Sequence, residues 1–170
     1  HDAEALNLAW NEFGSRYRFH EYKDTFKGGG KPVIQRISDR NHKGGADEVG
    51  LASALPVALC QGLIGHPFIC PDMVGGGEWS FNYVPGFKVD EELFVRMAQC
   101  SALFPMMQFS WAPWRMLGKE AQKYCLDAAK LHAKFADYII ENVKASAVSG
   151  EPIVRFMEYE YPHQGYERIN

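Results

Sequence analysis

The sequence predicts an α/β fold with parallel strands, because short apolar runs alternate with longer segments whose apolar residues recur at helical spacing. A second observation is that polar and glycine-rich residues gather in the loops after the apolar runs, where α/β proteins place their functional sites. A third is that the 170 residues contain no internal repeat, low-complexity segment or obvious linker. We therefore expect one α/β domain with its site at the carboxyl ends of the strands.

Apolar and loop-forming residues define the expected elements. Apolar side chains between Ala5 and Phe13 indicate a helix that ends at Gly14, and those between Ala121 and Ile139 indicate a long amphipathic helix. In chain order, the expected elements are a helix at 2–13, strands at 18–22 and 32–37, a helix at about 51–63, a strand at 66–70, a helix at 90–100, a buried strand at 102–111, a helix at 118–143 and a strand at 152–159.

The two ends of the chain lack features of a complete domain. The first helical pattern begins without an evident N-terminal cap, and the chain ends shortly after its last expected strand, with no closing element. We therefore expect residues 1–170 to be a piece of a longer protein.

Composition excludes several classes of protein. A net charge of -3 with scattered basic residues gives no reason to expect nucleic acid or an anionic membrane as a partner, and no apolar stretch reaches the roughly 18 residues of a membrane span. The six histidines and four cysteines form no HExxH or CxxC spacing, so we expect no metal site, and the cysteines read as buried free thiols. These features leave the cellular compartment open.

Three charged residues directly follow expected strands. Asp39 either caps a turn, pairs at the surface with Arg36 or Arg40, or takes part in catalysis. Asp72 ends a buried apolar run, so its carboxylate must be paired or hydrogen-bonded, whether it only caps the following glycine loop or belongs to a site. Lys23 is either solvated or part of such a group.

Tryptophans and glycines also gather after the strands. Trp79, Trp111 and Trp114 either pack in the core or offer faces on which a sugar ring could stack. The sequences KGGGK and GGGEW match neither a P-loop nor a dinucleotide fingerprint, so a phosphate- or nucleotide-binding domain is a weakly supported alternative.

Four ordered segments carry a family resemblance. RISDRNH, GLIGHPFICPDMVGGGEW, ALFPMMQFSWAPW and GEPIVRFMEY resemble, in this order, the later catalytic-barrel segments of glycoside hydrolase family 31. The resemblance implies that residues 1–170 are the C-terminal half of a (β/α)8 TIM barrel, lacking the N-terminal half and the strand with the nucleophile. It also implies a retaining α-glycosidase that acts on an α-linked carbohydrate, such as an α-galactoside or α-glucoside, through two carboxylates and without a cofactor.

The resemblance assigns roles to individual residues. Asp39 matches the general acid/base, and Asp72 matches the acid that supports the sugar-binding floor before the glycine turn. Lys23, sixteen residues before Asp39, stands where many members have an arginine that contacts the sugar. The implied substrate-binding residues are Lys23, Asp72, Trp79, Gln108, Ser110 and Trp111.

Two departures from the family pattern limit the resemblance. Gln108, Phe109 and Ser110 replace an Arg-Asn-His motif, so the sugar pocket should differ from that of a standard α-glucosidase. The nucleophile motif has no match, and the nearby acids Asp24 and Asp72 do not fit it. We therefore expect the 170 residues alone to be inactive and to need the missing half of the barrel; the alternative is a carbohydrate-binding α/β domain without chemistry.

Overall fold

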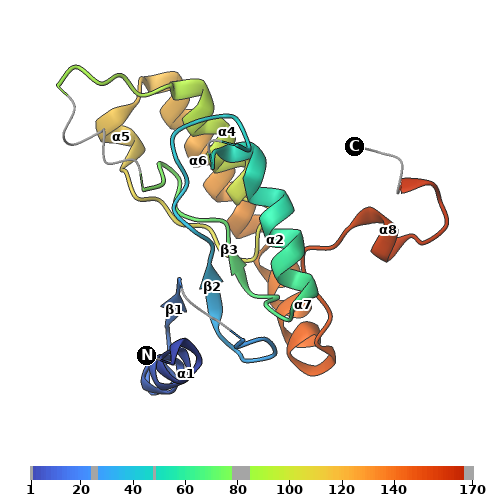
Figure 1. Cartoon of the computed structure of the whole chain (residues 1–170). Coiled ribbons are helices and arrows are strands. Elements are labelled where there is room, and N and C mark those ends of the chain that lie inside the picture. The colour runs from blue at the N-terminus through green and yellow to red at the C-terminus, as the bar shows by residue number, and fades with distance from the viewer. Residues whose placement is uncertain (1, 24–26, 48, 78–84, 167–170) are drawn as a thin grey trace.

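The protein is described by a computed structural model that covers residues 2–23, 27–47, 49–77 and 85–166 (Figure 1). Three short parallel strands, β1 (Glu21–Tyr22), β2 (Ile34–Arg36) and β3 (Ile69–Cys70), form a sheet in the order β1-β2-β3. In the register of this sheet, Tyr22 lies opposite Gln35 and Arg36 lies opposite Cys70. The carboxyl ends of all three strands therefore meet at one edge of the sheet.

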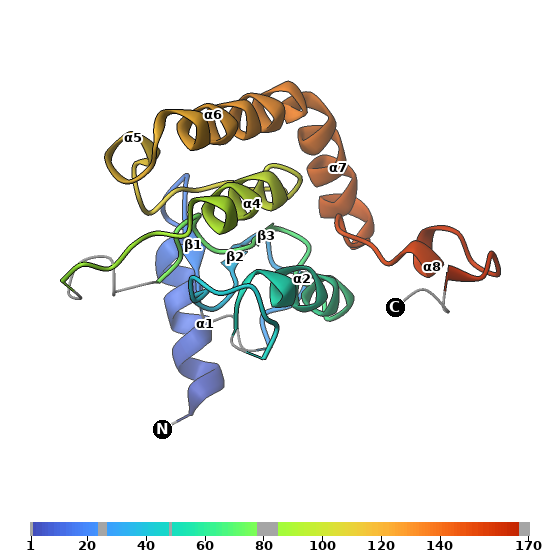
Figure 2. The same cartoon turned by 90° about the horizontal axis from the view of Figure 1, so that it is seen from above.

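Helices surround this sheet. Figure 2 shows α4 (Glu91–Ser101) lying between the strands and α6 (Lys119–Lys134). The other helices are α1 (Ala3–Gly14), the 3-10 helix η1 (Leu51–Ser53), α2 (Ala54–Leu63), α5 (Pro113–Met116), α7 (Ala136–Ser149) and α8 (Met157–Glu160). Among the residues that the structure describes, no helix combines the length and apolar character needed to cross a membrane.

The first helix has the N-terminal cap that the sequence analysis did not find. The Asp2 carboxylate accepts hydrogen bonds from the backbone N–H groups of Glu4 and Ala5, at 3.0 and 3.3 Å. Aspartate at this position satisfies N–H groups that have no partner within the helix. The expectation of an uncapped start was therefore wrong.

Among the described residues, the hydrophobic core forms two clusters. The larger one joins Phe94 of α4 to Ala121, Cys125 and Ala128 of α6 and to Val74 after β3. The smaller one packs α2 against the sheet through Ile37, Ala58, Ile69 and Phe104. The larger cluster lies beneath the loop that follows β3, and it therefore supports the end of the sheet where the candidate site lies.

The cysteines are free thiols, but one of them is exposed. Cys70 and Cys125 are buried, and burial raises their pKa values to about 12 and about 11. Cys100 is half-buried and Cys60 is exposed. The expectation of buried thiols is therefore wrong for Cys60.

Four predicted elements differ clearly from the structure. Within residues 102–111 the chain continues from α4 into turns and then forms a single parallel bridge, Val74 to Phe109, in place of a strand. The predicted helix at 118–143 is divided at Phe135 into α6 and α7. Residues 152–159, predicted as a strand, contain bends and the start of α8. The predicted strand at 18–22 is limited to β1.

Candidate active site

The structure brings Lys23 and Asp39 together. Lys23 directly follows β1, Asp39 follows β2, and the Lys23 Nζ forms an ion pair with the Asp39 Oδ1. The two side chains are 40% and 52% exposed, so a ligand can reach both of them. Because exposed ion pairs add little to stability, this pair is a better candidate for function than for holding the fold.

Asp72, in contrast, has a side chain that points into the protein and is buried. Its carboxylate is inaccessible to solvent and accepts hydrogen bonds from Arg36 Nη1 at 3.2 Å and from the backbone N–H of Arg40 at 2.8 Å. Its backbone has a φ of +79°, a left-handed conformation that aspartate tolerates better than most residues. In the structure Asp72 therefore supports the loops after β2 and β3 from below.

Because the Asp72 carboxyl group is buried, we expect the stability of the fold to depend on pH. Burial raises its pKa above the ordinary 3.8, against the opposing effect of the Arg40 and Met73 backbone N–H groups and of Arg36. A raised pKa means that the folded state binds the proton more tightly, so the stabilisation is complete below pH 3.8 and is lost as pH rises through the folded-state pKa.

We expect the unfolding free energy of the native chain minus that of Asp72→Asn to fall as pH rises from about 3 to about 7. Asparagine also tolerates a positive φ, so the variant removes the titrating group with little backbone strain. Urea unfolding of both proteins at each pH measures this difference in unfolding free energy. Titrating groups that both proteins share contribute equally to the two values and cancel in the difference. A difference that stays constant or grows with pH would contradict the assignment.

Contacts through Arg36 and Glu21 connect Gln108 to the sheet. Arg36 Nε lies 2.8 Å from Glu21 Oε1, and Gln108 Nε2 donates a hydrogen bond to Glu21 Oε2. Arg36 therefore pairs with Asp72 and Glu21, and Asp39 pairs with Lys23, whereas the sequence suggested Arg36 or Arg40 as its partners. Glu21 was missed by the sequence analysis, although a charged residue inside a short strand was a usable signal.

The glycines after β3 make room for protein groups. A Cβ atom added at Gly75 would lie 2.8 Å from Trp111 Cδ1, and one added at Gly77 would lie 2.7 Å from Asp39 Cβ. Gly76 has a φ of +60°, and its added Cβ would lie 2.2 Å from the Arg40 carbonyl oxygen. Because these spaces are filled by neighbouring residues, the loop gives no support to the phosphate-binding alternative.

Ser110 and Trp111 border the same loop. Ser110 Oγ lies 3.1 Å from the carbonyl oxygens of both Val74 and Gly76, either of which can accept its hydrogen bond. Trp79 and Asp24 lie outside the described residues. The structure therefore gathers Lys23, Asp39, Asp72, Gln108, Ser110 and Trp111 around the carboxyl ends of the strands.

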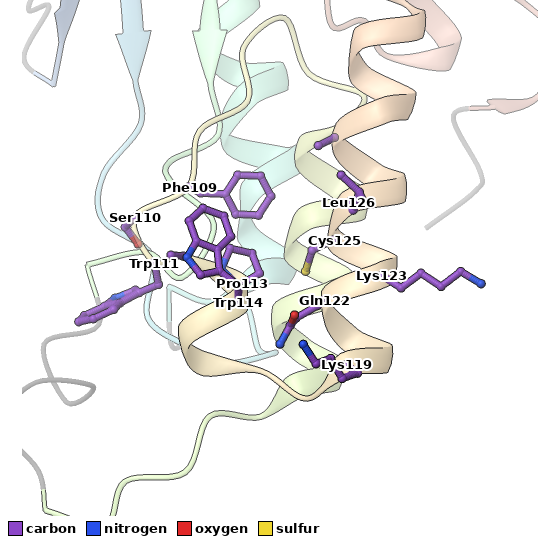
Figure 3. A pocket seen from close by; sticks show the side chains of 12 residues that line it. Phe109, Ser110, Trp111, Pro113, Trp114, Lys119, Gln122, Lys123, Cys125 and Leu126 are labelled. Atoms are coloured by element: carbon purple, nitrogen blue, oxygen red, sulfur yellow. The ribbon is translucent and has the colours of Figure 1, made fainter.

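An apolar groove adjoins this region (Figure 3). It has a volume of about 740 Å³ and lies between the segment after the Val74–Phe109 bridge and α6. Its lining includes Phe109, Trp111, Pro113, Trp114 and Leu126. Across the described ranges, no three His, Cys, Asp or Glu side chains are grouped so that they could hold a metal ion.

Comparisons with known proteins show that the chain is similar in sequence to a protein named as a glycosidase. No family model matches it. The chain is 34% identical over 123 residues to the mouse (Mus musculus) protein named myogenesis-regulating glycosidase, an alignment that covers 71% of this chain and 17% of that protein. It is 38% identical over 82 residues to the SITS-binding protein of Tetronarce californica, covering 48% of this chain and 10% of that protein. The chain thus spans less than a fifth of each relative, and these similarities support a relationship to glycosidase-like proteins.

Proposed function

We propose that this chain supplies the general acid/base of a retaining α-glycosidase of glycoside hydrolase family 31, and that Asp39 is that residue. The observation that carries the proposal is an accessible carboxylate, Asp39, beside Lys23 at the carboxyl ends of neighbouring parallel strands. The similarity of 71% of the chain to a protein named a glycosidase supports the same conclusion. The substrate would be an α-linked carbohydrate, with an α-galactoside or α-glucoside as the classes to test first.

The proposed chemistry uses Asp39 twice. The Asp39 carboxylic acid first protonates the glycosidic oxygen of the leaving group, and the resulting carboxylate then removes a proton from the water that hydrolyses the glycosyl-enzyme intermediate. The Lys23 ammonium fixes the orientation of the Asp39 carboxylate and can also donate to a sugar hydroxyl. Half exposure of both side chains leaves room for these contacts.

The remaining predicted residues would act mainly by shaping the site. Asp72 is buried, Gln108 is bonded to Glu21, and Ser110 lies against the carbonyl groups of the glycine loop. Each of these side chains already has a protein partner. We propose that they form the floor of the sugar pocket and that Trp111, packed against Gly75, offers the aromatic surface at its side.

The nucleophile would come from a further part of the same barrel. Retaining glycosidases place their two carboxyl groups about 5–5.5 Å apart, and the Glu21 and Asp72 carboxylates are already engaged by Arg36. Among the described strands β1 is at the edge of the sheet. Helix α1 exposes an apolar row formed by Leu6, Trp10 and Phe13, and Tyr17 in the turn after α1 extends this row. Both features support a missing half that pairs with β1 and covers α1.

The proposal is tested by comparing two proteins. The complete protein, meaning this chain joined to the proposed nucleophile-bearing half, should hydrolyse a p-nitrophenyl α-galactoside or α-glucoside, and residues 1–170 alone should not. Turnover by the 170 residues that is lost on changing Asp24 or Asp72 would contradict the proposed division of the two carboxylates.

Gly77 provides a steric test of the same site. Gly77→Ala places a methyl group 2.7 Å from Asp39 Cβ and 2.8 Å from its Cγ, so Asp39 must move. Because a displacement of about 1 Å can cost about 10²-fold in rate, we expect kcat/KM of the complete protein to fall by about that factor. Gly44→Ala is the matched control, since its added Cβ meets nothing within 4 Å, and it should retain activity. Equal activity of the two variants would contradict the placement of Asp39.

A non-catalytic carbohydrate-binding domain is the second candidate. One observation favours binding over hydrolysis, without indicating the ligand: a relative that matches 48% of the chain is named for binding SITS rather than for hydrolysis. Asp39→Asn in the complete protein separates the two functions. An enzyme would lose turnover of substrates with poor leaving groups and keep its affinity for sugar, whereas a binding protein would show no turnover in either form.

A further inference from the structure

Arg40, the residue after Asp39, is buried to an extent that is unusual for arginine. It is only 2% exposed and is among the largest fully buried side chains of the described chain. Its Nη1 donates to Ser53 Oγ, next to the first turn of α2, and Ser53 Oγ in turn lies 2.8 Å from the Gly50 carbonyl oxygen. The guanidinium thus fastens the loop after β2 to the start of α2.

The backbone of Arg40 is held on both sides as well. Its N–H donates to Asp72 Oδ2 at 2.8 Å, and its carbonyl oxygen accepts from the Gly77 N–H at 3.2 Å. One residue therefore connects the loop after β2 with both ends of the loop after β3. The side chain of Asp39 is half exposed, and its partner among the described residues is the exposed Lys23. The position of Asp39 is therefore fixed mainly through its neighbour Arg40.

Burial of Arg40 is difficult to explain by stability alone. Burial lowers the pKa of its guanidinium, with the charge of Asp72 acting in the opposite direction. Within the part of the chain that the structure describes, its Nε and Nη2 have no hydrogen-bond partner. Buried charges with incomplete hydrogen bonding are often no more stabilising than apolar residues of the same volume. This points to a role in holding the geometry of the loop.

We propose that Arg40 is a positioning residue for Asp39, setting where the Asp39 carboxylate stands relative to Gly77 and the glycine loop. This inference rests on the proposed function. Gly77 is the link between them, because its N–H bonds to the Arg40 carbonyl and its Cα faces the Asp39 side chain so closely that no Cβ fits. Movement of Arg40 would therefore move Asp39 away from the leaving-group oxygen.

Arg40→Met tests the proposal in the complete protein, since methionine fills the space of the aliphatic part of the arginine side chain and lacks the guanidinium. The expected result is a fall in kcat/KM of about 10²-fold for an α-glycoside with p-methoxyphenol as leaving group. With 2,4-dinitrophenol, which departs without protonation, the loss should be less than about tenfold. A purely structural role would lower both values by the same factor through a loss of folded protein, and that result would overturn the proposal.

Two further variants keep the test decisive. Arg96→Met is the matched control, because Arg96 forms an exposed ion pair with Glu92 on α4 and should change neither kcat/KM value. If Arg40→Met does not fold, Ser53→Ala removes only the hydroxyl that holds the guanidinium, and it should give the same leaving-group dependence with a smaller loss. A Ser53→Ala protein with equal losses for both leaving groups, or with none, would overturn the proposal.

The outcomes separate this inference from the proposed function. Absence of hydrolysis by the unmodified complete protein would refute the proposed function. If hydrolysis depends on Asp39, but Arg40→Met and Ser53→Ala do not change how kcat/KM depends on the leaving group, only the positioning role would be refuted. Amide hydrogen exchange adds a readout independent of activity: the Arg40 and Gly77 N–H groups should lose protection together in Arg40→Met and keep it in Arg96→Met.

Discussion

Replacing Asp39 by alanine in the complete protein is expected to lower kcat/KM by about 10²–10⁴-fold for an α-glycoside with a poor leaving group. The physical reason is that a poor leaving group cannot depart as an anion and needs a proton, which Asp39 would supply under the proposed function. For a 2,4-dinitrophenyl α-glycoside the first step needs no proton, so kcat/KM should change by less than about tenfold. Initial rates over a series of aryl leaving groups measure this dependence.

The matched control is Asp127→Ala. Asp127 is an exposed aspartate on α6, away from the strand ends, and its removal should leave the leaving-group dependence unchanged. The fold should tolerate both substitutions, because Asp39 is half exposed and surface ion pairs contribute little to stability. A parallel loss for all leaving groups in Asp39→Ala would show that Asp39 does not act as the proton donor.

The second large effect is expected at Phe94. Its side chain is fully buried between α4, α6 and Val74, and its ring lies directly below the glycine loop, 3.2 Å from where a Cβ at Gly75 would stand. Phe94→Ala should lower the unfolding free energy by about 3–5 kcal/mol, because it removes apolar contacts and leaves a cavity. Thermal or urea unfolding of the 170-residue chain measures this loss.

Phe19→Ala is the comparison for Phe94→Ala. Phe19 is 84% exposed, so its removal should change the unfolding free energy by less than about 0.5 kcal/mol. If the two variants lost similar amounts of stability, the cluster around Phe94 could not be the core that supports the loop after β3.

The sequence predicted those elements that local pattern determines. Apolar spacing and Gly14 set α1, and the runs at 32–37 and 66–70 contain β2 and β3 in parallel pairing. Residues 102–111 and 152–159 were predicted as strands because they are apolar, but a strand also needs pairing partners that a local pattern does not reveal. The break at Phe135 carries no proline or glycine, so the sequence gives no warning of it.

The sequence indicated which charged residues follow the strands, but not which of them contact one another. The end of each strand indicated Lys23, Asp39 and Asp72, and the structure brings these residues to one edge of the sheet. Which charges pair was not predictable, because Arg36 could face Asp39 or Asp72 depending on the twist and length of β2. The role of Arg40 was hidden for the same reason: most arginines are exposed, and only the fold shows that this one is buried.

The configuration of the product that Asp39→Ala forms with azide distinguishes a general acid/base from a nucleophile at this position. Azide can enter the space left by the carboxylate, on the face from which the leaving group departed, and attack the glycosyl-enzyme intermediate of a 2,4-dinitrophenyl α-glycoside. Two successive displacements retain configuration, so we expect an α-glycosyl azide, identified by the anomeric coupling in its NMR spectrum. A β-glycosyl azide would mean that Asp39 is the nucleophile and would refute the proposal that this chain supplies the general acid/base.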